Sequence, residues 1–213
     1  MRIRFEATAR TFNEAAEYGI LLRKTSRQKR AYYISVIIGL LAVTVSVLIT
    51  ASYEVETSTI LEIYLLAALL IVMIIDRSCG RVRKALCMFY RGQMRQTESE
   101  RTQILQLVLE DDDKFHVYRD GIEQSVWDCL ILKKALESEE IFDLTGGGKR
   151  STALSIPKSA LKSGRIDDFR EYLSAKLPRQ KSVSYYEIPQ KLKDCIVEEK
   201  QKAQTRYSRY YGK

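Results

Sequence analysis

The strongest constraint on the fold is a stretch of 23 consecutive residues, 31–53, that contains no charged side chain. A helix rises about 1.5 Å per residue, so this stretch would extend roughly 34 Å, which exceeds the ~30 Å hydrocarbon core of a bilayer. A second stretch, residues 57–75, carries one charge, Glu62, and would extend about 28 Å. Buried helices of soluble proteins rarely run so far without a charge. The sequence therefore predicts two membrane spans that form a transmembrane hairpin over residues 31–76.

A cleaved signal peptide is the other explanation for an apolar stretch near the N-terminus. Some thirty residues, many of them polar or charged, precede the first stretch, and its 23 residues exceed the ~7–15 residues of a signal core. We therefore expect an uncleaved anchor.

The net charge of +8 is unevenly distributed along the chain. Basic residues exceed acidic ones by five in each of three segments, residues 1–30, 77–101 and 178–213. Acidic residues exceed basic ones by four in residues 31–76 and by three in residues 102–177. Lys and Arg accumulate on the cytoplasmic side of short loops, and both flanks of the hairpin are basic. The sequence thus predicts a multi-pass protein of the cell (plasma) membrane with both termini in the cytoplasm.

Outside the hairpin, the sequence predicts four cytoplasmic segments. Residues 1–30 should form a strand, in which Ile3 and Phe5 alternate with charged residues, and then a helix with Thr11 and Glu14 at capping-box spacing. This N-terminal strand and helix are expected to pack against something else in the cytoplasm, such as the later domain. A basic juxtamembrane helix over 77–102, a domain over 103–178 and a basic, tyrosine-containing tail over 179–213 complete the chain.

The segment 103–178 has short apolar runs separated by turns, which is typical of an antiparallel sheet. The triplet RDG at 119–121 and the GGGK turn at 146–149 supply glycines for hairpins. The second turn is not a nucleotide loop, because Asp143 stands where that motif has glycine and Arg150 where it has a hydroxyl. After Pro157, apolar residues at helical spacing predict one closing helix: Ile166, Phe169, Tyr172, Leu173 and Leu177. The fold class is therefore an α+β membrane protein, with a two-helix hairpin and a cytoplasmic antiparallel β domain closed by a C-terminal helix.

Two groups of residues are candidate contact sites. Cations interleaved with apolar residues after the second span would meet anionic headgroups: Arg81, Lys84, Arg91 and Arg95. The alternative for that segment is a simple continuation of the second helix into the cytoplasm. Small residues recur on one face of the first span and would pack against Ala67 and Ala68 of the second span or against another copy of the chain: Ser35, Gly39, Ala42, Ser46 and Thr50. Glu62 invites an ion-pathway role, but its place near the outer end of the span favours a carboxylate that reaches water.

No catalytic, metal or cofactor site is predicted. The chain has one histidine, His116, four cysteines without a C-x-x-C spacing, and no G-x-S-x-G elbow. The domain over 103–178 is itself acidic, which argues against nucleic acid as a partner. We therefore expect a protein that is not an enzyme and needs no cofactor.

Several residues of the cytoplasmic segments resemble the YcxB-like family of small bacterial membrane proteins, over nearly all of residues 1–178. The resemblance lies in a glycine and isoleucine after a turn, a tryptophan, an Ile-Pro-Lys triplet and a helix phenylalanine: Gly121, Ile122, Trp127, Ile156, Pro157, Lys158 and Phe169. It implies a domain similar to pleckstrin-homology folds but does not indicate a biochemical role. Trp127 and Phe169 should then be buried between sheet and helix, and Lys158 would be an exposed cation, able to touch a headgroup phosphate or simply solvated.

The leading functional hypothesis is a non-enzymatic, membrane-anchored interaction module at the cytoplasmic face of a bacterial plasma membrane, which binds a protein partner or the lipid surface. The alternative is a small oligomeric channel or transporter subunit assembled through the small-residue face. The tail over 179–213 starts as a helix and either contacts anionic lipid or remains solvated.

Overall fold

The structure is a computed structural model that describes residues 3–52, 57–79, 81–94, 96–146, 153–178 and 182–211. The chain divides into two compact units, Lys24–Lys84 and the combination of Met1–Arg23 with Ala85–Lys213. Each unit is described by itself. The model confirms an α+β fold with two long apolar helices and antiparallel sheets.

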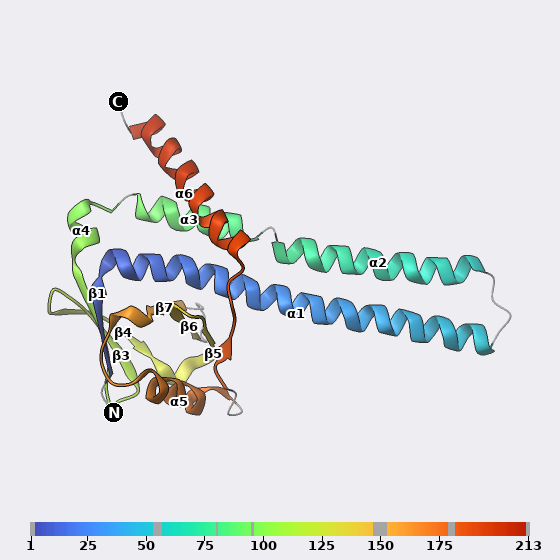
Figure 1. Ribbon diagram of the computed structural model, residues 1–213, viewed down its shortest axis with the longest axis horizontal. Helices are drawn as coiled ribbons and strands as arrows, with labels where there is room; N and C mark the ends of the chain where they lie inside the picture. The colour runs from blue at the N-terminus through green and yellow to red at the C-terminus, as the bar shows by residue number, and fades with distance from the viewer. Residues whose placement is uncertain are drawn as a thin grey trace. The chain divides into compact units, whose positions relative to one another are not determined.

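The unit Lys24–Lys84 contains most of helix α1 (Ala9–Ser52) and helix α2 (Thr57–Cys79) (Figure 1). Both helices are long and apolar enough to cross a membrane, which by length and composition is a weak indication of membrane association. Large apolar side chains are exposed on them, for example Leu40 at 63% and Leu66 at 67%. Of the small side chains, Ala42 and Ala67 are buried, whereas Ala68 is exposed.

Helix α1 differs from the expectation at its start. It begins at Ala9, and Thr8 rather than Thr11 acts as its cap, because the Thr11 backbone N–H donates to Thr8 Oγ1 at 3.4 Å. Glu14 pairs with Arg10 at 3.4 Å, so the capping box expected from Thr11 and Glu14 is wrong. The helix then continues without a break into the apolar stretch, since no proline interrupts it.

The first sheet has five strands in the order β4-β3-β2-β1-β8: β1 (Ile3–Thr8), β2 (Ile104–Leu109), β3 (Lys114–Arg119), β4 (Ile122–Asp128) and β8 (Leu161–Ser163). The predicted N-terminal strand is confirmed, and it pairs antiparallel with β2, from Ile3 opposite Leu109 to Thr8 opposite Ile104. The predicted hairpin at 119–121 is also confirmed. Gly121 has φ 81°, a left-handed conformation that glycine adopts without strain.

The second sheet has four strands in the order β7-β6-β5-β9: β5 (Leu132–Glu137), β6 (Ile141–Gly146), β7 (Ala153–Pro157) and β9 (Ser184–Tyr185). β6 and β7 pair antiparallel up to Thr145 opposite Ala153, as a hairpin would. The glycine turn expected between them lies outside the described residues, apart from Gly146 at the end of β6. β9 pairs in parallel with β5, a contact that the sequence did not predict.

Helix α5 (Ile166–Lys176) closes the core between the sheets, as predicted. Phe169 is fully buried, and its ring centroid lies 5.2 Å from that of Phe5, 6.0 Å from Phe115 and 5.0 Å from Phe142. Trp127 is only half-buried beside this core, so the expected full burial applies to Phe169 and not to Trp127.

Three further helices complete the fold: α3 (Arg81–Gln93), α4 (Glu98–Thr102) and α6 (Gln190–Tyr211). The single juxtamembrane helix expected over 77–102 is therefore divided, because α3 ends at Gln93 and α4 begins after a new cap at Thr97. The tail, for which a solvated chain was one alternative, is helical over most of its length.

Candidate functional site

Strand β6 is covered on both faces, which explains the buried run Ile141–Leu144. Successive side chains of a strand point to opposite faces. Phe142 therefore joins the core with α5, and Asp143 points to the other face, where the first turns of α1 lie. Ser155 of β7, which stands opposite Asp143 in the register, shares that face.

Asp143 is the centre of a buried polar cluster. Its Oδ1 accepts a hydrogen bond from Ser155 Oγ at 2.7 Å and lies 2.5 Å from Arg23 Nη1. The carboxyl group is fully buried, and Oδ2 has no hydrogen-bond partner among the described residues. Burial raises the pKa of Asp143, although the charge of Arg23 and the Ser155 hydrogen bond act in the opposite direction. The cluster thus attaches α1 to the second sheet.

Gly19 allows this close approach of helix to sheet. A Cβ atom at this position would lie 2.6 Å from Asp143 Oδ1 and would also overlap Ser155 Oγ. Only glycine fits there without a shift of the helix or of the two side chains. The Gly19 position therefore sets the distance between α1 and strands β6 and β7.

Beside this contact lies a pocket of about 370 Å³. Its apolar wall comes from α1, α3, β2 and β7, and includes Phe12, Ala16, Ile20, Phe89, Leu105 and Leu154. Its polar groups are Asn13, Gln106, Arg23 and Ser155. A concave apolar site with a few polar groups is the usual form of a small-molecule site. We refer to it as the α1 pocket.

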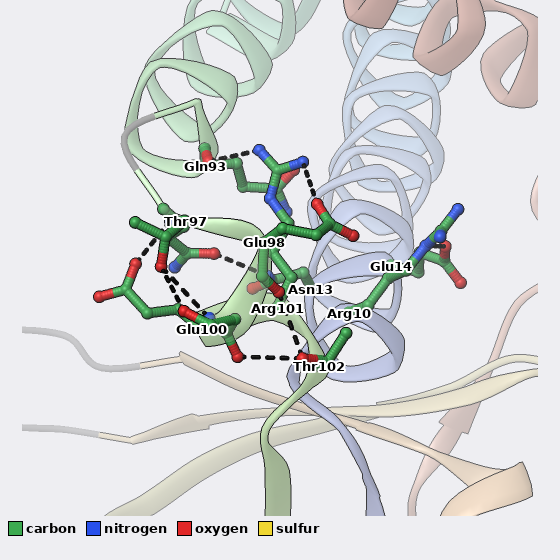
Figure 2. A network of polar contacts seen from close by, with 11 residues as sticks. Arg10, Asn13, Glu14, Gln93, Thr97, Glu98, Glu100, Arg101 and Thr102 are labelled. Carbon is green, nitrogen blue, oxygen red and sulfur yellow. Dashed lines mark hydrogen bonds and ion pairs between the residues drawn. The ribbon is translucent and has the colours of Figure 1, made fainter.

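The connection from α3 to β2 is held in place by the network in Figure 2. Thr97 and Glu100 form a capping box, in which the Glu100 backbone N–H donates to Thr97 Oγ1 at 3.3 Å and the Thr97 N–H donates to Glu100 Oε2 at 2.7 Å. Arg101 donates to the Gln93 carbonyl at 3.0 Å. Asn13 Nδ2 donates to Gln96 Oε1 at 3.1 Å, which joins this connection to α1. One end of the α1 pocket is thereby fixed.

A second concavity, of about 460 Å³, lies between α1 and α6. Glu17 is 3% exposed at its base, and Lys200 Nζ of α6 lies 3.9 Å from Glu17 Oε1. Burial raises the pKa of Glu17 and outweighs the lowering by Lys200. Tyr90 of α3, fully buried, donates to the Ile196 carbonyl at 3.5 Å. No described side chain of α6 is fully buried, but Leu192, Cys195 and Ile196 are half-buried.

Lys158 is not the exposed cation that the sequence suggested. Its side chain is 15% exposed, and its Nζ lies 2.7 Å from Glu137 Oε1 and over the Phe142 ring. Glu137 also accepts from Arg170, whose Nε and Nη2 lie 2.8 and 2.7 Å from its two oxygens. Burial acts to raise the pKa of Glu137, but these hydrogen bonds prevail and lower it. Lys158 therefore has a structural partner 21 residues earlier in the chain.

The other candidate surface cations are only partly described. Lys84 and Arg91 are exposed, whereas the Arg81 side chain and the whole of Arg95 lie outside the described residues. The apolar residues between them do not form a free face, because Leu86 and Tyr90 are fully buried and Phe89 lines the α1 pocket. Among the described apolar side chains of α3, Leu86 and Tyr90 are therefore covered by protein, whereas Met88 is 64% exposed.

The small-residue face of the first span is largely covered. Ser35, Ala42 and Ser46 are buried, Gly39 is half-buried and Thr50 is exposed. The hydroxyls of Ser35, Ser46 and Thr50 donate to carbonyls one turn earlier, at 2.9, 2.8 and 2.7 Å, so none of these donors is left in an apolar environment without a partner.

The structure also places Glu62 and His116, which the sequence analysis considered. Glu62 is exposed on α2. His116 lies 3.3 Å from an Asp112 oxygen and 3.4 Å from a Glu123 oxygen. In the described part of the chain, no group of three His, Cys, Asp or Glu side chains could hold a metal ion.

Comparisons with known proteins add nothing to this geometry, since no protein-family model, curated protein or solved structure matches the chain. The proposed function therefore depends on the residues of this chain alone.

Proposed function

We propose that this protein is a non-enzymatic interaction module anchored in a bacterial cell membrane by a two-helix hairpin. The observation that supports this most directly is the inverted polarity of Lys24–Lys84. Large apolar side chains such as Leu40, Leu48 and Leu65 are 63%, 60% and 65% exposed, whereas the small side chains of Ala42 and Ala67 are buried. In water such a surface would be strongly unfavourable, whereas in lipid it is the expected arrangement.

The pairing of β1 with β2 supports a topology with both termini in the cytoplasm. β1 precedes the apolar helices in sequence and β2 follows them, yet the two strands are hydrogen-bonded neighbours. Segments that share a sheet must lie on the same side of a membrane, so the chain between them crosses an even number of times. The basic flanks then favour the cytoplasmic side for both strands.

The YcxB-like relationship and a pleckstrin-homology-like domain are part of the same proposal. Two mainly antiparallel sheets with one closing helix, α5, are consistent with that architecture. The partner of such a module is a cytoplasmic protein or the lipid surface. The competing channel hypothesis uses the small-residue face as an interface between copies, but Ser35, Ala42 and Ser46 are already covered within one chain, which favours the module.

Topology can be tested with a reporter that is active only outside the cytoplasm. Fused after Lys213, it should stay silent, whereas the same reporter inserted after Glu56 in the short link should be active. Activity of the Lys213 fusion, or extraction of the full chain from membranes by alkaline carbonate, would contradict the proposal.

A further inference from the structure

We propose that the α1 pocket binds a single-chain anionic amphiphile, a linear alkyl chain that ends in a carboxylate or phosphate. The inference rests on the proposed membrane anchor, because a bilayer is the source of such molecules. It assigns a ligand class to a pocket for which the proposed function names none.

The shape of the pocket fits one extended chain. Phe12, Ala16, Ile20 and Arg23 line it and follow one another at intervals of four, four and three residues, which places them on one face of α1. Eleven residues of helix separate the first from the last, a length of about 16 Å. The lining along α1 is therefore about 16 Å long, and the pocket volume of about 370 Å³ is too small for a partner helix of that length, whose diameter with side chains is about 10–12 Å.

The charge in the pocket selects an anionic end group. Among the described side chains that line it, Arg23 alone is charged, and it stands at one end of the row along α1. Its side chain is 25% exposed, so the guanidinium is accessible from the pocket. The partner behind it, Asp143, is fully buried and does not line the pocket. Asp143 already offsets much of the charge of Arg23, but guanidinium N–H groups other than those of Nη1 can donate to a carboxylate or phosphate, whereas a quaternary ammonium offers no acceptor for them.

Photolabelling of the full chain in nanodiscs of phosphatidylcholine tests the inference. Two probes would carry the same diazirine alkyl chain, one ending in a carboxylate and the other in trimethylammonium. Mass spectrometry should find both probes on the two apolar helices, but only the anionic one on peptides that contain Phe12, Ala16 or Leu154. An anionic phospholipid that bears the diazirine on one acyl chain would show whether a free amphiphile or a bilayer lipid supplies the ligand.

Variants that fill the pocket provide the control. Ala16→Trp should lose the pocket label and retain the label on the apolar helices, whereas Val126→Trp, on the exposed edge strand β4, should retain both. Leu154→Phe serves the same purpose if Ala16→Trp fails to fold. If the apolar helices are labelled and the pocket is not, or if filling the pocket leaves its label unchanged, the inference is overturned and the anchor stands. Absence of label on the apolar helices would overturn the anchor itself.

Discussion

Replacement of Gly19 by alanine tests whether α1 lies directly on the second sheet. In an isolated helix this change would be favourable by about 1 kcal/mol, because glycine is a poor helix former. In the structure the added methyl would stand 2.6 Å from Asp143 Oδ1 and overlap Ser155 Oγ. These oxygens cannot move freely, since Arg23 and Ser155 both bond to Asp143.

The size of the effect follows from a matched variant. Gly92 lies in α3 and has no heavy atom within 4 Å of the position of a Cβ, so Gly92→Ala should leave stability unchanged or raise it by up to ~1 kcal/mol. Both changes add the same methyl to a helix. The difference between them is therefore the cost of overpacking, which is about 1–3 kcal/mol in closely packed sites. We expect Gly19→Ala to be the less stable variant by that amount.

Urea unfolding of the full chain in micelles measures this difference. Trp127 is the only tryptophan, and it belongs to the same unit as Gly19, with its ring centroid 6.0 Å from that of Phe115. Its fluorescence should therefore report unfolding of this unit. Equal midpoints for Gly19→Ala and Gly92→Ala would show that α1 does not approach β6 and β7 at this distance, and the wall of the α1 pocket would then be misplaced.

Three further predictions use the same assay. Phe169→Ala should destabilise the protein by about 3–5 kcal/mol, as expected for a fully buried aromatic ring. Trp127→Ala should cost clearly less, because Trp127 is only half-buried, and its urea unfolding is followed by circular dichroism since the fluorophore is lost. Glu137→Gln should cost about 1–3 kcal/mol at neutral pH. The pKa of Glu137 is lowered, so its contribution to the free energy of unfolding is present above the ordinary pKa of 4.5 and is lost as pH falls. The difference in stability between the variant and the parent should therefore close on acidification. The pKa of Glu17 is raised, so its contribution to the free energy of unfolding is greatest below pH 4.5 and is lost as pH rises. The stability of Glu17→Gln relative to the parent should therefore be highest at alkaline pH.

Local patterns predicted the elements of the fold well. The alternation of Ile3 and Phe5, the glycine of the 119–121 turn and the helical spacing around Phe169 each depend on a few neighbouring residues. Such signals arise from backbone sterics and burial of one face, so they are present in the sequence itself. The pairing of β1 with β2 was not specified in this way, because alternation marks a strand without naming its partner.

The polar sites were missed for a related reason. Asp143 stands between two buried apolar residues, which could have indicated a strand covered on both faces, but nothing local identifies Arg23 as its partner. Lys158 follows the last residue of a strand and therefore seemed exposed, yet Glu137 and the Phe142 ring accommodate it. In both cases the missing information is the distant residue that the side chain meets, which no local pattern specifies.

The order of strands also constrains how the chain can fold. β1 lies between β2 and β8, so it is an interior strand of its sheet and needs partners on both sides. Both partners follow the apolar helices in sequence, and β2 begins only at Ile104. The first strand to be synthesised therefore cannot pair until the two helices have been made and β2 has returned to the same side. Contacts of such high sequence separation are slow to form, because the loop between them must close first. If the proposed hairpin inserts into a membrane, it would bring β1 and β2 to one membrane face and so shorten that search, which would couple insertion of the hairpin to folding of the domain.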